Sequence, residues 1–288
     1  MPTLPVLIII PHCSGFVPFH ILADMLGEDV YSETAYQQKL NYLYHEGDPY
    51  TDALFHVPGA THVSALVSRF VVDVNRRRDA GGLNGVVKLT DFKGIPLYQT
   101  DFDLTDARKE ERLKRFFDPF HATIDRMLTA KDISFFIDAH SMTPEGPFIG
   151  PDTGEPRPAF TVITGGDSKG QALLPDDYTS IPHNLAHEVI DKLEKHFGDI
   201  VQDTPGVPNA YWLNDPFSGG GTQRRLSNPA NPNYCPGFAL EFNRALFLRP
   251  DEHGIDQPIP GRIESLNKRF RAFVHDLVPS FQQITQLS

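Results

Sequence analysis

Residues 6–12 read Val-Leu-Ile-Ile-Ile-Pro-His, and this stretch indicates the class of fold. Five consecutive branched apolar residues, with no polar alternation, are typical of a strand that is covered on both faces, as strands are in α/β proteins. The run is short, lacks a basic leader and is closed by Pro11. It therefore fits a buried strand better than a signal peptide or a membrane span.

Further apolar runs and helical patterns alternate along the chain. The other apolar runs lie at 69–74, 133–139, 159–164 and 238–242. Apolar residues with helical spacing mark the stretches 104–130, 182–197 and 261–277. This alternation predicts an α/β fold with a mixed, mostly parallel sheet and helices on both faces. Since no internal repeat or long low-complexity linker interrupts it, we expect residues 1–288 to form a single domain.

Composition and charge exclude several classes of partner. The 288 residues include 37 acidic and 26 basic side chains, which gives a net charge of −11. Such a chain is poorly suited to binding nucleic acid or anionic lipid, and an anionic substrate would have to meet a local group of arginines. Two cysteines imply no disulfide framework, so we expect a soluble cytoplasmic protein without a membrane or nucleic-acid partner.

Reactive side chains stand near the ends of three predicted strands. His12 follows the first run, Asp138 and His140 end the run that begins at 133, and Glu241 lies near the end of the last. In an open α/β sheet, ligands bind beyond the carboxyl ends of the strands. Two histidines and a carboxylate form a three-ligand zinc site with an open position, although a histidine at a strand end can also be a plain hydrogen-bonded residue.

Six segments, in order along the chain, carry the motifs of one enzyme family. They are Pro-His-Cys-Ser-Gly at 11–15, Thr-Asp at 51–52, Ser-Arg-Phe-Val-Val-Asp-Val-Asn-Arg at 68–76, Asp-Ala-His-Ser-Met at 138–142, Gly-Gly at 219–220 with Thr222 and Arg224, and Leu-Glu at 240–241. In these segments the chain resembles the N-formylglutamate amidohydrolases, a family related in fold and mechanism to zinc carboxypeptidases. It departs from the family at Cys13, where a small residue is usual, and in the loop 219–225.

The resemblance implies a site and a reaction. The implied zinc ligands are His12, Asp52 and His140, and zinc would polarise the carbonyl and lower the pKa of its bound water. Glu241 would take a proton from that water and pass it to the leaving amine. The side chains implied to hold the substrate's carboxylates are Arg69, Asn75, Arg76 and Arg224. Arg69 or Arg76 would also stabilise the oxyanion.

The implied substrate is a small anionic N-acyl amino acid. Hydrolysis of N-formyl-L-glutamate to L-glutamate and formate, a reaction of histidine degradation, is the favoured version. Alternatives are a zinc carboxypeptidase, a deacylase of another N-acyl amino acid, and a non-catalytic binder of acidic metabolites on the same fold. Glu241 argues against the binder, because an unpaired charge in an apolar strand is costly and a binder has no use for a buried base.

Several assignments have a structural alternative. Asp48 competes with Asp52 as the carboxylate ligand, because Thr51 and Asp52 also read as a helix cap. Arg225 competes with Arg224 for contact with the substrate.

The remaining polar residues in the motif segments suggest structural roles. We expect Asp73 to pair with an arginine and Asp138 to orient a ligand histidine. His183 and His187 read as a solvated helix face, since the Glu of a His-Glu-x-x-His zinc site is missing. Cys13 as a nucleophile is disfavoured, because a Cys–His enzyme would need an orienting acid and no metal. Glu241 could instead form an ion pair with an arginine of the 68–76 segment.

Overall fold

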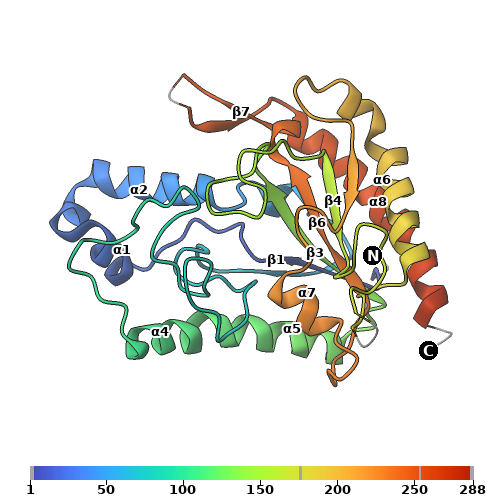
Figure 1. The fold of residues 1–288 in the computed structure, drawn as a ribbon, viewed down its shortest axis with the longest axis horizontal. Helices are drawn as coiled ribbons and strands as arrows, with labels where there is room; N and C mark the ends of the chain where they lie inside the picture. The colour runs from blue at the N-terminus through green and yellow to red at the C-terminus, as the bar shows by residue number, and fades with distance from the viewer. Residues whose placement is uncertain (1–2, 175–176, 253, 286–288) are drawn as a thin grey trace.

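The computed structural model describes residues 3–174, 177–252 and 254–285. A six-stranded sheet with the strand order β2-β1-β3-β6-β4-β5 lies at its centre (Figure 1). The strands are β1 (Val6–Ile10), β2 (Thr61–Ser64), β3 (Phe135–Met142), β4 (Phe160–Ile163), β5 (Tyr211–Leu213) and β6 (Gly237–Asn243). All neighbouring pairs are parallel except β4 and β6, which are antiparallel. The prediction of a mixed, mostly parallel sheet is confirmed.

Helices cover both faces of this sheet (Figure 1). One face packs against α3 (Thr51–Leu54), α6 (His183–Gln202) and α8 (Arg262–Thr285). The other packs against α1 (Phe19–Leu26), α2 (Glu33–Glu46) and α5 (Asp118–Ala130), while α4 (Asp106–Arg112) precedes α5 along the chain. Successive residues of a strand point to opposite faces, so Ile8 belongs to the first core and Ile9 to the second. This explains why the sequence of β1 is apolar throughout.

The predicted helical stretches are present, and α6 and α8 continue beyond their predicted ends to Gln202 and Thr285. A π-helical turn at Leu113–Phe117 joins α4 to α5, so that residues 106–130 form one helical run. Its start is capped by Thr105, whose side chain accepts a hydrogen bond from the backbone N–H of Arg108. None of the helices in the described parts of the chain is long and apolar enough to cross a lipid bilayer.

The prediction of a strand at 69–74 is wrong. Residues 68–76 form consecutive buried turns, with hydrogen bonds from Val71 N to Ser68 O and from Arg76 N to Asp73 O. The apolar run there reflects burial, not extension. The place beside β1 is taken by β2, whose four residues, Thr-His-Val-Ser, carry too few apolar side chains to be recognised in the sequence. The polar residues of the 68–76 turns consequently face the ends of the strands.

The order of the strands determines where the site lies. β1, β3 and β6 are adjacent and parallel, so their carboxyl ends meet at one edge of the sheet. In the register of β3 and β6, His140 is paired directly with Glu241. Beyond β6 the chain forms the short helix η3 (Arg244–Leu246) and a two-stranded antiparallel sheet of β7 (Leu248–Pro250) and β8 (Asp256–Pro258).

Candidate metal centre

Three buried donor atoms converge at this edge of the sheet. His12 lies just beyond β1, His140 lies in β3, and Asp48 lies in the turn after α2. The Nδ1 atom of His12 is 3.3 Å from Oδ2 of Asp48, and Nδ1 of His140 is 3.2 Å from the same oxygen. The two Nδ1 atoms are 3.2 Å apart. The three side chains are 2–4% exposed, and among the described residues they form a grouping able to hold a metal ion.

The dimensions of this triangle fit one zinc ion. Zinc binds nitrogen and oxygen ligands at about 2.0–2.1 Å in tetrahedral geometry, which puts neighbouring ligand atoms about 3.3–3.4 Å apart. The three separations of 3.2–3.3 Å are close to that value. Two facing imidazole lone pairs at 3.2 Å also need a proton or a cation between them. The donor set therefore suits a small divalent metal.

The outer nitrogens of both histidines contact carboxylates. His12 Nε2 is 2.9 Å from Oδ1 of Asp73, and His140 Nε2 is 3.1 Å from Oδ1 of Asp138. A hydrogen on His12 Nε2, directed to Asp73, leaves its Nδ1 free to bind a cation, whereas the contact of His140 Nε2 with Asp138 lacks hydrogen-bond geometry. Asp138 still lies where a carboxylate that orients His140 would lie. Asp73 pairs with an arginine as expected, at 2.9 Å from Arg69 Nη2, and also contacts His12.

Asn75 lies behind His140. Its Nδ2 atom is 2.9 Å from His140 Nε2, and its Oδ1 accepts a hydrogen bond from the backbone N–H of Thr222. A β-carbon on Gly220 would lie 2.7 Å from Asn75 Oδ1, so this approach requires glycine in the loop before α7 (Gly221–Leu226). Asn75 therefore links that loop to His140, and its predicted contact with the substrate stays a prediction.

The structure does not bring Asp52 into the cluster. Asp52 is exposed in the first turn of α3, whereas Asp48 is held against the end of β1 by a hydrogen bond from its backbone N–H to His12 O. The expected ligand Asp52 is therefore replaced by the alternative, Asp48. Tyr50 occupies the N-cap position of α3, so the interpretation of Thr51 and Asp52 as a cap is also wrong.

Asp48 remains a carboxylate despite its burial. Burial alone would raise its pKa, but His12, His140 and Arg69 together hold the pKa well below its ordinary value. The net effect favours the charged form, which is the form that binds a metal. For His140, burial would lower the pKa, but Asp138, Asp48 and Glu241 raise it well above the ordinary value. The cluster therefore attracts a positive charge, either a proton or a metal ion.

Glu241 lies beside His140 on β6 and lacks the ion pair that we considered for it. Its Oε2 atom is buried with no hydrogen-bond partner, and the described residues place no cation within ion-pair distance of its carboxylate. Burial raises its pKa, although His140 opposes the shift. A carboxylate with a raised pKa and a free oxygen is suited to accept and return a proton.

The predicted arginines occupy different places. Arg69 is buried between the two acids, with Nη1 3.5 Å from Asp48 and Nη2 2.9 Å from Asp73. Arg76 is half-buried nearby, with Nε 3.8 Å from Asp73. Arg224 and Arg225 are tied elsewhere, because Arg224 donates to Gly165 O and pairs with Asp177, and Arg225 pairs with Asp125 of α5 at 2.7 Å. The structure thus gathers Arg69 and Arg76, but not Arg224, around the candidate metal ligands.

Two cations of the site were missed in the sequence. Lys88 is 1% exposed, and its Nζ lies 3.5 Å from Asp73, while burial lowers its pKa to about 8. Arg244 is 6% exposed and lies 3.3 Å from Oδ1 of Asp48. The available signals in the sequence were that Lys88 follows two valines and that Arg244 directly follows an apolar strand. Neither signal indicates the acid that the side chain contacts, because each contact joins distant parts of the chain.

Three residues outside the cluster, Cys13, His183 and His187, are unsuited to the alternative roles considered for them. Burial raises the pKa of Cys13 to about 12, so its thiol stays neutral and is a poor nucleophile. His183 and His187 are exposed on α6, as expected for a solvated helix face.

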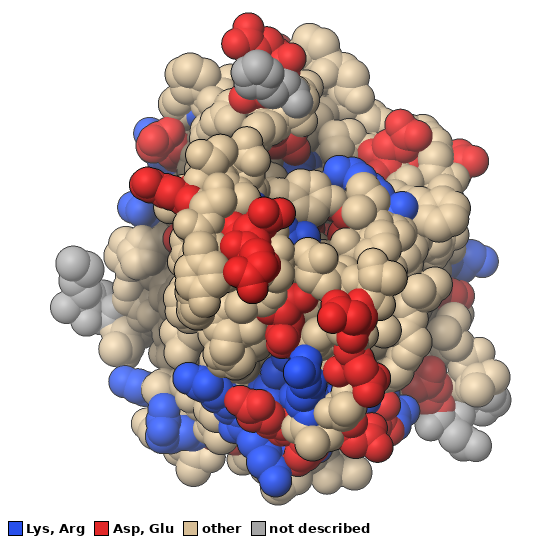
Figure 2. Space-filling model, turned by 90° about the vertical axis from the view of Figure 1, so that its left-hand side faces the viewer, with Lys and Arg blue, Asp and Glu red and all other residues tan. Residues whose placement is uncertain are grey.

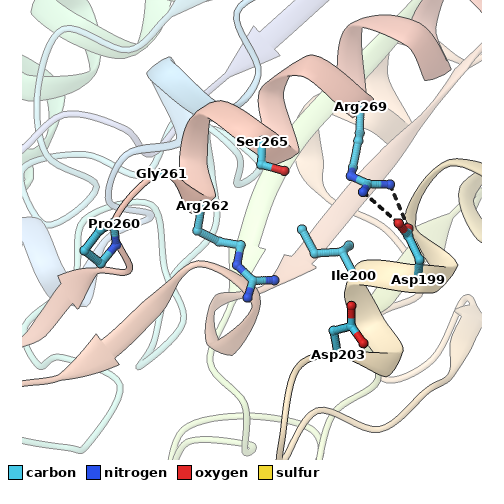
Figure 3. A pocket seen from close by; sticks show the side chains of 8 residues that line it. All are labelled: Asp199, Ile200, Asp203, Pro260, Gly261, Arg262, Ser265 and Arg269. Carbon is cyan, nitrogen blue, oxygen red and sulfur yellow. Dashed lines mark hydrogen bonds and ion pairs between the residues drawn. The ribbon is translucent and has the colours of Figure 1, made fainter.

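The cations nearest the candidate metal ligands are buried or half-buried. On the face shown in Figure 2, Lys and Arg side chains gather toward the lower edge and are interspersed with Asp and Glu. A surface pocket between the end of α6 and the start of α8 contains an ion pair of Asp199 with Arg269 and is distant in sequence from the cluster (Figure 3). Arg69, Arg76 and Lys88, in contrast, surround Asp73 beside the candidate metal ligands.

Two histidines, Asp48 and Glu241 meet at one edge of the parallel part of the sheet. The protein is therefore an α/β protein with a candidate metal centre. The model of the N-formylglutamate amidohydrolase family matches residues 4–248, so the chain belongs to this family. This confirms the resemblance seen in the sequence motifs.

Individual proteins are similar to this chain in sequence or in fold. An N-formylglutamate deformylase of Pseudomonas putida is 30% identical over 116 residues, which are 34% of this chain and 43% of the deformylase. The matched part thus spans less than half of that enzyme. The structure is similar to that of an N-formylglutamate amidohydrolase from Ralstonia eutropha JMP134, with a TM-score of 0.66, 19% identity, and coverage of 98% of this chain and 96% of that one. A gene product of Agrobacterium tumefaciens has a TM-score of 0.59 at 17% identity, with 99% and 93% covered.

Proposed function

We propose that the protein is a zinc-dependent amidohydrolase of small N-acyl amino acids, with N-formyl-L-glutamate as its favoured substrate. The observation that carries the proposal is the triangle of His12 Nδ1, His140 Nδ1 and Asp48 Oδ2, with edges of 3.2–3.3 Å, beside the unpartnered carboxylate of Glu241. The products would be L-glutamate and formate.

The protein's own side chains have separate tasks in this proposal. His12, His140 and Asp48 would hold the zinc, which when bound supplies a Lewis acid that polarises the scissile carbonyl and acidifies the attacking water. Glu241 accepts the proton of the water and delivers it to the leaving amine, a transfer for which its raised pKa is suitable. Arg69, buried between Asp48 and Asp73, supplies fixed positive charge beside the reacting carbonyl.

The balance of charge supports a substrate with two carboxylates. Four acids form or adjoin the site, namely Asp48, Asp73, Asp138 and Glu241, and four cations accompany them, namely Arg69, Arg76, Lys88 and Arg244. Because these charges cancel, a bound Zn²⁺ leaves two positive charges in a nearly dry site. A dianion such as N-formylglutamate neutralises them, whereas a neutral N-acyl amide does not.

The test compares two substrates that differ in one group. N-formyl-L-glutamine keeps the formyl amide and replaces the side-chain carboxylate by an amide. We expect N-formyl-L-glutamate to be hydrolysed much faster, because a carboxylate clamp is typically worth about 2–5 kcal/mol when truncated. Chelation of the metal should abolish the activity and added zinc should restore it. Equal rates on both substrates would exclude the formylglutamate assignment, and activity that survives complete metal removal would exclude the zinc centre.

Arg224 is proposed as a carboxylate clamp on the basis of the family motif. Its guanidinium would have to leave Asp177 and the Gly165 carbonyl to reach the substrate. Replacement of Arg224 by alanine should reduce the preference for N-formyl-L-glutamate, whereas Arg225→Ala, which removes the pair with Asp125, is the matched control. The single-domain organisation, the role in histidine degradation and the cytoplasmic location stay predictions.

A further inference from the structure

We propose that Arg244 is a positioning residue that determines which oxygen of Asp48 faces the metal. The inference rests on the proposed metal centre and concerns one side chain that the family motifs did not single out. Arg244 does not itself contact the donor triangle. It acts through Asp48, which it holds from the side opposite to the two histidines.

All three nitrogens of the Arg244 guanidinium donate hydrogen bonds around Asp48. Nε donates to Ser141 Oγ at 3.2 Å, and Nη1 donates to His45 O at 3.0 Å. Nη2 donates to Gly47 O and lies 3.3 Å from Asp48 Oδ1. Because the guanidinium is planar and its donors are fixed relative to one another, these partners are held in one arrangement.

The two oxygens of Asp48 are thereby given different surroundings. Oδ1 faces Arg244 at 3.3 Å and Arg69 at 3.5 Å. Oδ2 faces the two histidine Nδ1 atoms and accepts from the backbone N–H of Ser141 at 3.3 Å. A carboxylate held by cations on one oxygen presents the other as a single ligand atom. Without Arg244, Oδ1 of Asp48 would keep only the longer contact to Arg69.

The same side chain joins the three elements that carry the proposed chemistry. His45 and Gly47 belong to the end of α2, which leads into Asp48. Ser141 follows His140 in β3, and Arg244 itself follows β6, which carries Glu241. The guanidinium thus fixes the carboxylate ligand relative to both a histidine ligand and the general base. Carbonyls at the C-terminus of a helix have no partner within the helix and attract a cation, which further stabilises the contact of Arg244 with the end of α2.

A buried arginine can also be purely structural, and Arg112 provides the comparison. It is 4% exposed and donates to Tyr98 OH at 2.6 Å and Val71 O at 3.5 Å, with no contact to Asp48. Replacement of either arginine by methionine removes a buried guanidinium. Only Arg244→Met should change the affinity for a metal, whereas both variants should lower stability.

The experiment is a Zn²⁺ titration of the metal-free full-length protein against a chromophoric competitor. We expect Arg244→Met to weaken Zn²⁺ binding by about 10–100-fold, the usual effect of removing a group that orients a metal ligand. Arg112→Met should bind Zn²⁺ as the wild type does. In an Asp48→Asn background, Arg244→Met should cost little further affinity, because its partner charge is already absent.

Two results would overturn the inference: wild-type Zn²⁺ affinity in Arg244→Met, or the same fold-loss in the Asp48→Asn background as in the wild type. If Arg244→Met does not fold, Arg244→Lys keeps the charge but cannot reach α2 and Asp48 together. Its Zn²⁺ affinity should still fall several-fold, and unchanged affinity would again refute the inference. If neither the wild type nor His12→Ala binds Zn²⁺, the proposed metal centre is wrong. This result differs from the two above, in which the wild type binds Zn²⁺ and only the role of Arg244 fails.

Discussion

Replacement of Asp73 by asparagine tests the charge arrangement around the site. The side chain is fully buried, and its carboxylate lies 2.9 Å from Arg69, 2.9 Å from His12 and 3.5 Å from Lys88. The amide keeps the shape but removes the negative charge, so Arg69 and Lys88 remain buried without it. Removing one partner of a buried ion pair typically costs about 3–5 kcal/mol. Because the whole unfolding free energy of a domain is about 5–15 kcal/mol, the loss should be large.

The assay is denaturant unfolding of the two proteins at several pH values. Burial alone would raise the pKa of Asp73, but Arg69, His12, Arg76 and Lys88 hold it well below its ordinary value, so the folded state favours the charged form. A carboxyl group with a depressed pKa stabilises the protein above its unfolded pKa and loses that effect as the pH falls through the folded pKa. The difference between wild type and Asp73→Asn should therefore be constant from pH 5 to 7 and shrink below about pH 4.

The control for this experiment is an exposed pair of the same chemistry. Asp79 lies 2.8 Å from Arg77, with both side chains largely exposed. Asp79→Asn should leave the unfolding free energy nearly unchanged, because solvent already screens the pair. Equal stability of Asp73→Asn and Asp79→Asn at neutral pH would refute the reasoning, since it would mean that burial adds nothing to the value of the Asp73 charge.

Two further predictions concern catalysis and pH. Glu241→Gln should bind zinc normally and lower kcat by roughly two to four orders of magnitude, and near-normal kcat would remove Glu241 from the mechanism. Burial lowers the pKa of His121 to about 4, so protonation favours the unfolded state. Stability should fall as the pH drops from about 6.5 to 4, by up to about 3 kcal/mol from this group. His121→Gln, which keeps a donor for the Val74 carbonyl, should flatten this slope in thermal unfolding, and an unchanged slope would exclude His121 as its source.

The sequence predicted the sheet edge well, for a physical reason. Runs such as 6–10 and 238–242 are apolar because both faces of each strand are covered. This pattern can be recognised in the sequence without knowing which distant residues pack on the strand. Parallel neighbouring strands then bring His12, His140 and Glu241 to one edge. The run at 69–74 shows the limit of the pattern, since buried turns are as apolar as buried strands.

The polar contacts of the site were harder to predict. Asp48 and Asp52 are four residues apart, and only contacts made in the folded chain, such as the hydrogen bond of Asp48 N to His12 O, show which of them faces inward. Lys88 and Arg244 reach their partners, Asp73 and Asp48, across distant parts of the sequence. Such contacts depend on the packing of loops, for which periodicity provides no signal.

The zinc content of four purified proteins tests the metal centre most directly. Wild type and Asp52→Asn should each hold about one zinc per chain, as a three-ligand catalytic site does. Asp48→Asn and His140→Ala should be purified with well under one zinc per chain, because each weakens zinc binding by removing one corner of the donor triangle. Full zinc occupancy in both of these variants, or a loss in Asp52→Asn with none in Asp48→Asn, would contradict the assignment of the centre.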